Sequence, residues 1–270
     1  MPVTSTAAAV AASDGRSVSL VGEVLRDIAR GGIAGLLTGI VVAGLGGRIV
    51  MRLAALIVPT SAGRFTENGN QIGDITFSGT FGLILVGGLF FGLFGATVWV
   101  VVSPWIPGAG LRRAIFTMPI AVALTGMVLI QGTNPDFRIL AHDGRVVAVL
   151  LALVALAGLS IALLDGWLDD RLPHAGAASR APIALYLILA LAGGLLILPI
   201  VILGYFDADA RLGLALVGVG LATLAGWLLR GRGRVRPPSL LIAGRAALLA
   251  AVVFGVLELA PEVAAALGTT

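Results

Sequence analysis

The 270-residue chain has no cysteine and no lysine, and only 12% of its residues are charged. Without cysteine there is no disulfide framework, no thiol chemistry and no cysteine-ligated metal. Only His142 and His174 offer imidazole, which gives little basis for a metal or haem centre. The absence of lysine excludes a retinal Schiff base. We therefore expect neither a cofactor nor a metal.

Common catalytic motifs are also missing. The chain contains no G-x-x-x-x-G-K-[ST], no H-E-x-x-H and no G-x-S-x-G. It therefore matches neither an ATP-driven pump with its own nucleotide site nor the common membrane proteases.

Apolar residues are abundant, at 58% of the chain, with a mean hydropathy of +1.05. This composition is far from that of a soluble domain and predicts a polytopic membrane protein. Seven apolar runs, at about 31–57, 79–102, 114–131, 146–166, 183–204, 212–229 and 240–259, predict an all-α bundle of about seven spans. The third and sixth runs are short, so a count of six spans stays open.

The distribution of arginine predicts the orientation. With the N-terminus in the cytoplasm, eleven arginines fall inside and four outside, in line with the positive-inside rule. Trp99, Trp105, Trp167 and Trp227 all lie near span ends on the same side, as interfacial tryptophans do. We expect a multi-pass protein of a bacterial inner membrane, with the C-terminus outside. This topology also explains the net charge of +4 without a nucleic-acid partner.

Four segments are predicted. Residues 1–17 are expected to form a disordered cytoplasmic tail, 18–30 an amphipathic surface helix, 31–260 one transmembrane domain and 261–270 a short outer tail. Residues 18–30 could instead simply extend the first span.

Glycines recur at helix-packing spacing, at Gly35, Gly39, Gly88 and Gly92. Small residues let membrane helices approach closely. They predict packing within one bundle, or a homo-oligomer or membrane complex.

The first span carries two arginines, Arg48 and Arg52, four residues apart and thus on one helix face. Such charges at the bilayer centre cost at least about 2.5 to 3.5 kcal/mol each, so they need water or carboxylates. The outer loops offer polar partners, namely Glu67, Asp74, Asn134, Asp136 and Asp143. We predict either an outward site for an anion or a lipid headgroup, formed by Arg48, Arg52, Asp74, Asn134 and Asp136, or an ion-pair network that only ties the loops to this span.

The fourth span ends in L-L-D-G-W-L-D-D-R-L-P, with Asp165, Asp169 and Asp170. Asp165 and Asp169 are one turn apart and could share a divalent cation that holds a phosphate, which would indicate a membrane enzyme. The alternative is an interfacial charged cap.

A loop between the last two spans carries four alternating arginines, Arg230, Arg232, Arg234 and Arg236. They predict contact with anionic lipid headgroups, or serve only to set the topology.

Read in order, GGRIVMRLAALIVP, TENGNQIGDIT, NPDF and LLDGWLDDRLP resemble a loose group of polytopic inner-membrane proteins of actinobacteria and similar high-GC bacteria. The resemblance covers about residues 25–175 and implies location but no activity.

The sequence favours a non-catalytic binding or accessory component with an outward polar site. The first alternative is a small secondary transporter or lipid-handling protein with Arg48 and Arg52 on an anion or headgroup path. The second is an enzyme that uses Asp165, Asp169 and Asp170.

Overall fold

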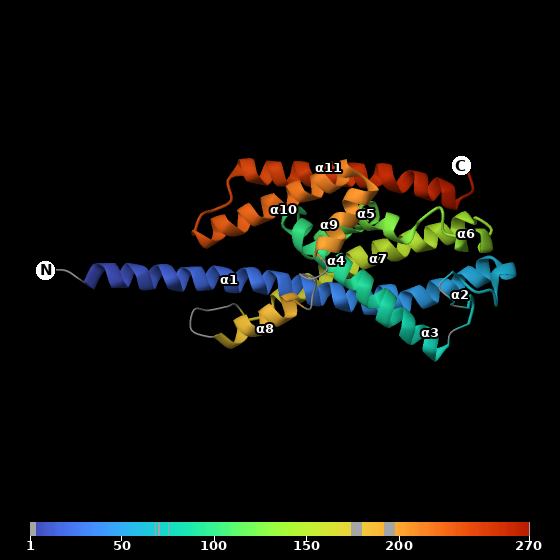
Figure 1. Ribbon diagram of the computed structural model, residues 1–270, viewed down its shortest axis with the longest axis horizontal. Coiled ribbons are helices and arrows are strands. Elements are labelled where there is room, and N and C mark those ends of the chain that lie inside the picture. The colour runs from blue at the N-terminus through green and yellow to red at the C-terminus, as the bar shows by residue number, and fades with distance from the viewer. Residues whose placement is uncertain are drawn as a thin grey trace.

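The computed structural model describes residues 4–67, 69, 71–74, 76–173, 180–191 and 198–269, and these form an all-α protein (Figure 1). The chain begins with α1 (Thr4–Thr38), which continues through the π-helix η1 (Gly39–Gly46) into α2 (Gly47–Ile57). After the turn η2 (Pro59–Ser61), α3 (Phe77–Gly82), the π-helix η3 (Leu83–Gly88), α4 (Leu89–Val102) and η4 (Ser103–Trp105) form a second rod. The remaining helices are α5 (Gly110–Leu129), α6 (Asp136–Ile139), α7 (Gly144–Asp169), α8 (Arg180–Ala190), α9 (Leu198–Ala208), α10 (Ala210–Gly231) and α11 (Pro238–Ala266).

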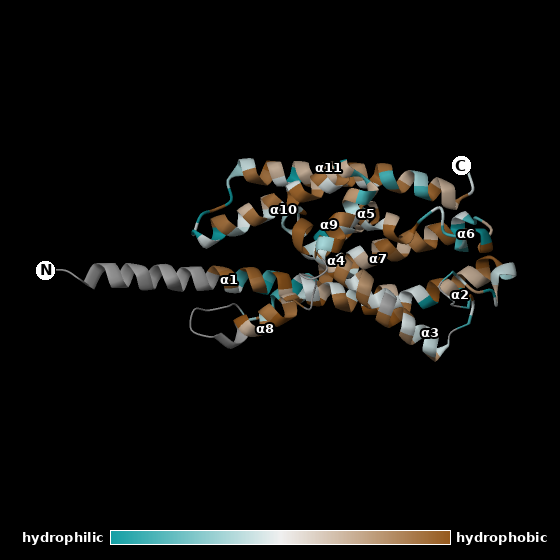
Figure 2. Cartoon of the chain, in the orientation of Figure 1, coloured by the Kyte–Doolittle hydropathy of each residue, from teal (hydrophilic) through white to brown (hydrophobic). Residues whose placement is uncertain are grey.

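Six helices among the described residues are long and apolar enough to cross a membrane. They are Leu20–Ile57, Phe77–Trp105, Gly110–Leu129, Gly144–Asp169, Ala210–Gly231 and Pro238–Ala266. The chain is therefore a multi-pass membrane protein by helix length and composition. Hydrophilic residues gather in the loops at the helix ends, such as the α10–α11 connection and the loops around α6 (Figure 2).

The predicted run at 183–204 is described only at its ends, in α8 and in the short apolar helix α9, because residues 192–197 lie outside the described part of the chain. The third and sixth runs, which are short in the sequence, both form membrane-length helices, Gly110–Leu129 and Ala210–Gly231. A seventh span at 183–204 stays a prediction. The predicted surface helix at 18–30 is continuous with α1, and the predicted tail at 1–17 overlaps the start of the same helix.

Glycines let the backbone of α1 and η1 contact the backbone of η3 and α4. A Cβ on Gly39 would lie 2.0 Å from the Gly88 carbonyl oxygen, and one on Gly35 would lie 2.7 Å from that of Gly92. No side chain fits there, which is why α1 and η1 pack so closely on α4 and η3. These glycines are used within one chain, and association between copies through them stays a prediction.

Two aspartates cap the helices that start after the loops. The Asp143 side chain accepts the Arg145 backbone N–H at 2.8 Å and caps α7, and Asp209 accepts that of Arg211 at 2.6 Å and caps α10. The Arg145 hydrogen bonds lower the pKa of Asp143 to about 2, and the Arg211 backbone N–H lowers the pKa of Asp209. Both carboxylates therefore stay ionised and hold the helix starts.

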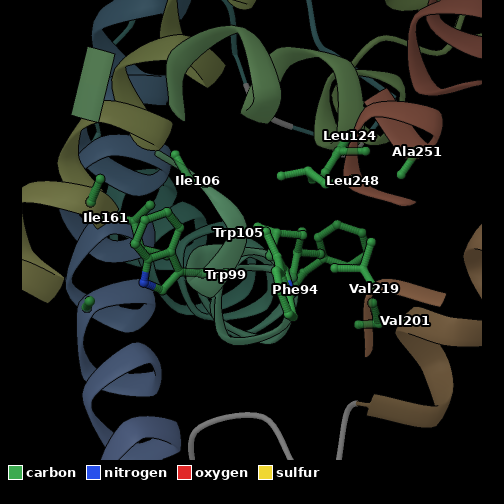
Figure 3. Packing of buried hydrophobic residues seen from close by; sticks show 14 of the residues in the cluster. Phe94, Trp99, Trp105, Ile106, Leu124, Ile161, Val201, Val219, Leu248 and Ala251 are labelled. Atoms are coloured by element: carbon green, nitrogen blue, oxygen red, sulfur yellow. The ribbon is translucent and has the colours of Figure 1, made fainter. Parts of the chain in front are cut away.

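The main apolar core lies between α4, α5, α7, α9, α10 and α11 (Figure 3). Trp99 and Trp105 belong to it and are only 2% and 1% exposed. Trp105 Nε1 donates to the Thr223 hydroxyl at 2.8 Å, which explains how its polar atom is accommodated. Trp99 and Trp105 thus pack inside the protein rather than against lipid, whereas Trp167 is half-exposed. The position of these rings at headgroup level stays a prediction.

Candidate functional site

Arg26 of α1 closes the end of α7. This side chain is 2% exposed, and its Nη1 donates to Asp169 Oδ1 at 2.8 Å. Its Nη2 and Nε also donate to the backbone carbonyls of Asp169 and Leu172, at 2.7 and 3.2 Å. The Asp169 carbonyl is the last of α7, and the Leu172 carbonyl belongs to the turn that follows it. Carbonyls at a helix C-terminus lack partners within the helix and attract a cation. The charge of Arg26 is therefore neutralised inside the protein rather than exposed to solvent.

Asp165 is the most buried carboxylate of the same helix end, at 2% exposure. Its Oδ1 accepts Arg30 Nε at 2.8 Å, and its Oδ2 lies 3.5 Å from Arg113 Nη1. Arg30 also pairs with Asp169 and, at 3.8 Å, with Asp27. One buried carboxylate thus links α1, α5 and α7, at a depth where an isolated charge would be very unfavourable.

A second set of contacts ties α1 to α10. Asp27 accepts Arg230 Nη1 at 3.0 Å and Trp227 Nε1 at 3.3 Å. Arg236, in the loop after α10, lies over the Trp105 ring at 5.5 Å and makes no ion pair among the described residues. Burial, and secondarily the nearby Arg230, lower the pKa of Arg236. A guanidinium keeps its proton in proteins, so the shift means that this charge is poorly compensated.

These side chains surround a cavity of about 300 Å³, which we call the polar cavity. Its arginines are Arg26, Arg30, Arg113, Arg230 and Arg236, and its carboxylates are Glu23, Asp27, Asp165 and Asp169. Five positive and four negative groups leave one positive charge in excess.

A second cavity, of about 250 Å³, lies between α1, η1, α2, η3, α4, α5 and α7, and we call it the apolar cavity. Its wall is formed mainly by aliphatic and glycine residues, with Phe91, Phe94 and Trp99 as the aromatic ones. Along α7 it extends from Ile161 to Leu150, about 16 Å of helix. Two polar groups on its wall, Trp99 Nε1 and Thr38 Oγ1, are buried without a hydrogen-bond partner among the described residues.

The two cavities follow one another along the same helices. Trp99 lines both of them, and the Arg113 guanidinium lies over its ring at 4.9 Å. Arg113 in the polar cavity is one turn from Thr117 in the apolar cavity, and Asp165 is one turn from Ile161. Since one turn rises about 5.4 Å, the linings of the two cavities are about that far apart along α5 and α7, and Trp99 forms part of both walls. Figure 3 shows this ring on the side of Ile161.

At the predicted outer site, Arg48 and Arg52 contact different parts of the protein. Arg48 is 4% exposed, with Nη1 3.5 Å from Met51 Sδ, while Arg52 Nη1 donates to the Gly73 carbonyl at 2.5 Å. Arg52 thereby holds the loop that follows the first span.

The loop residues of that site contact each other. Asp136 Oδ1 accepts the Glu67 backbone N–H at 2.8 Å, and Asn134 Oδ1 accepts that of Asp136. Asp74 is exposed. These contacts favour the loop-tying alternative, and a ligand at Arg48, Arg52, Asp74, Asn134 and Asp136 stays a prediction.

Two of the three aspartates predicted to form a cluster are paired with arginines. Asp165 and Asp169 are brought together, but Arg30 bridges them, and Asp170 is exposed and apart from the polar cavity. Among the described residues no three histidine, aspartate or glutamate side chains form a group that could hold a metal. Their arrangement is that of an ion-pair network.

The loop arginines divide into two kinds. Arg230 and Arg236 line the polar cavity, whereas Arg232 and Arg234 are exposed and outside it. Contact of all four with lipid headgroups stays a prediction.

Sequence reasoning missed the role of Arg113, Trp99 and Arg26. In the sequence Arg113 is one of the eleven arginines on the predicted cytoplasmic side, and Arg26 falls in the predicted surface helix at 18–30. The available signal was the pairing of opposite charges, Arg26 and Arg30 against Asp165 and Asp169, each at one turn's spacing and at the same predicted membrane face.

We compared the chain with protein-family models, curated proteins and solved structures, and none of them matches it.

Proposed function

We propose that this integral membrane protein is a lipid-handling protein that binds one membrane lipid inside its helix bundle. The apolar cavity takes a hydrocarbon chain, and the polar cavity lies at the headgroup level of the same leaflet. The observation that carries the proposal is the shared Trp99 wall, because it joins an apolar and a charged space along the same four helices.

The dimensions support a lipid. A hydrocarbon core is about 30 Å thick, so one leaflet contributes about 15 Å. The apolar cavity extends along about 16 Å of α7. A chain from one leaflet therefore matches the cavity in length.

The energetics point the same way. Apolar walls around about 250 Å³ of unfilled space lack van der Waals contacts on one side, which is unfavourable. A hydrocarbon chain recovers these contacts, whereas water finds few partners on such a wall. The predicted orientation, with most loop arginines inside, favours a polar cavity at the cytoplasmic leaflet.

Gly95 allows a direct test. It lines the apolar cavity, and a Cβ there would meet nothing within 4 Å, so Gly95→Leu fills the space without a backbone clash. Gly204→Leu is the matched control, because Gly204 is a helical glycine with the same free space but outside the cavity.

Both variants and the parent protein are purified in mild detergent, and the lipid retained per chain is measured by native mass spectrometry. We expect about one tightly held lipid on the parent and on Gly204→Leu, and a clear loss on Gly95→Leu at unchanged helicity. Equal lipid content in all three proteins would overturn the proposal.

A further inference from the structure

We propose that the polar cavity recognises the phosphate of the bound lipid's headgroup, and that Arg113 and Arg236 are the residues that bind it. The inference rests on the proposed function, since it assigns the headgroup of the same ligand.

The other three arginines of the polar cavity already form ion pairs with carboxylates at short distances. Arg26 is held by Asp169 and the end of α7, Arg30 by Asp165 and Asp169, and Arg230 by Asp27. A charge held at these distances has little to gain from a further anion.

Arg113 and Arg236 are different. Arg113 donates from Nη2 to the Ser103 carbonyl at 2.6 Å, but it reaches its carboxylate partner, Asp165, only at 3.5 Å, and its Nε is buried without a hydrogen-bond partner among the described residues. Arg236 makes no hydrogen bond or ion pair in that part of the chain. Each also lies over a tryptophan ring, Arg113 over Trp99 and Arg236 over Trp105. The excess positive charge of the cavity therefore lies on these two groups.

The ligand must also be an anion that hydrogen-bonds well. Guanidinium groups present several N–H donors in one plane and match the oxygens of a phosphate. Trp99, which lines both cavities, has an Nε1 donor that is buried without a partner among the described residues. An oxygen-rich group at the inner end of the polar cavity would satisfy such donors, and a phosphate joined to a hydrocarbon chain places its oxygens there.

The test compares lipids that differ only in the headgroup. The full-length protein in detergent is titrated with phosphatidic acid and with diacylglycerol of the same chains, and separately with inorganic phosphate. We expect phosphatidic acid to bind about tenfold more tightly than diacylglycerol, as for one or two charge-assisted hydrogen bonds. We expect inorganic phosphate to bind far more weakly than phosphatidic acid.

The variants are Arg113→Gln and Arg236→Gln, with Arg112→Gln and Arg234→Gln as matched controls that remove the same charge from exposed neighbours outside the cavity. Arg113→Gln and Arg236→Gln should each lose most of the preference for phosphatidic acid and keep diacylglycerol binding. The controls should keep the preference.

The possible failures are distinct. If diacylglycerol and phosphatidic acid bind equally to the parent protein, the headgroup assignment fails while lipid binding stands. If inorganic phosphate binds as tightly as phosphatidic acid, the site is one for a free anion and the assignment to a lipid fails. If neither lipid binds, the proposed function itself fails.

Discussion

The substitution Asp165→Asn tests the ion-pair network most directly. It keeps the size of the side chain but removes the charge that Arg30 and Arg113 share at 2.8 and 3.5 Å. Removing one partner of a buried ion pair costs about 3 to 5 kcal/mol. Arg30 keeps its contact with Asp169, so we expect the low end, about 3 kcal/mol.

The assay is the thermal unfolding of the purified protein in detergent. For a chain of this size 1 kcal/mol shifts the Tm by about 2 to 4 °C, so Asp165→Asn should lower it by about 6 to 12 °C. Asp170→Asn is the matched control, because Asp170 is exposed and one residue beyond the helix end. Surface changes of this kind stay within about 0.5 kcal/mol.

A double substitution sharpens the result. If Asp165 stabilises the bundle through Arg113, the loss in Asp165→Asn plus Arg113→Gln should be smaller than the sum of the single losses. A Tm for Asp165→Asn equal to that of Asp170→Asn, or strictly additive losses, would refute the network.

Three further predictions concern other parts of the fold. Gly39→Ala should lower the Tm by several degrees, because the added Cβ would lie 2.0 Å from the Gly88 carbonyl and overpacking costs about 1 to 3 kcal/mol. Arg52→Ala should speed hydrogen exchange in residues 59–76, since the loop loses its hydrogen bond to the Gly73 carbonyl. Asp143→Asn should flatten the pH dependence of the Tm between pH 4 and 2. A folded-state pKa of about 2 stabilises the fold above the ordinary value of 3.8, and this contribution disappears as the pH falls towards 2.

Each of these changes has a control. Gly82→Ala adds the same methyl group in open space, and Arg64→Ala removes a charge from the same loop at an exposed position. Asp74→Asn removes an exposed carboxylate that caps no helix. The reasoning is wrong where a variant and its control behave alike. For Arg52 there is a second outcome: loss of anion binding without faster exchange would support the predicted outer ligand site instead.

The sequence predicts the membrane class and the position of most long helices, because an apolar run of about 20 residues has few alternatives to a span. It does not predict the π-helices η1 and η3, which lie inside two of the apolar runs. Hydropathy measures preference for an apolar environment and does not register the hydrogen-bond pattern of the backbone.

The candidate site is harder to predict, for two physical reasons. Pairing between Arg30 and Asp165 depends on which helices are neighbours, and these residues are 135 positions apart. The apolar cavity is invisible in the sequence, because residues that face lipid and residues that face a cavity are equally apolar. Trp99 and Trp105 show the same limit, since the sequence indicates an interface and the structure buries them in the core.

The long separation within the Arg26–Asp169 pair has a consequence for biogenesis. The two residues are 143 positions apart. At about 5 to 20 residues per second, roughly 7 to 29 s pass between the synthesis of the arginine and that of its carboxylate. During that interval Arg26 lacks the carboxylate and the carbonyl of Asp169 that neutralise it in the folded protein. The nascent chain must therefore keep this end of α1 at the membrane surface, or shielded by the insertion machinery, until α7 emerges.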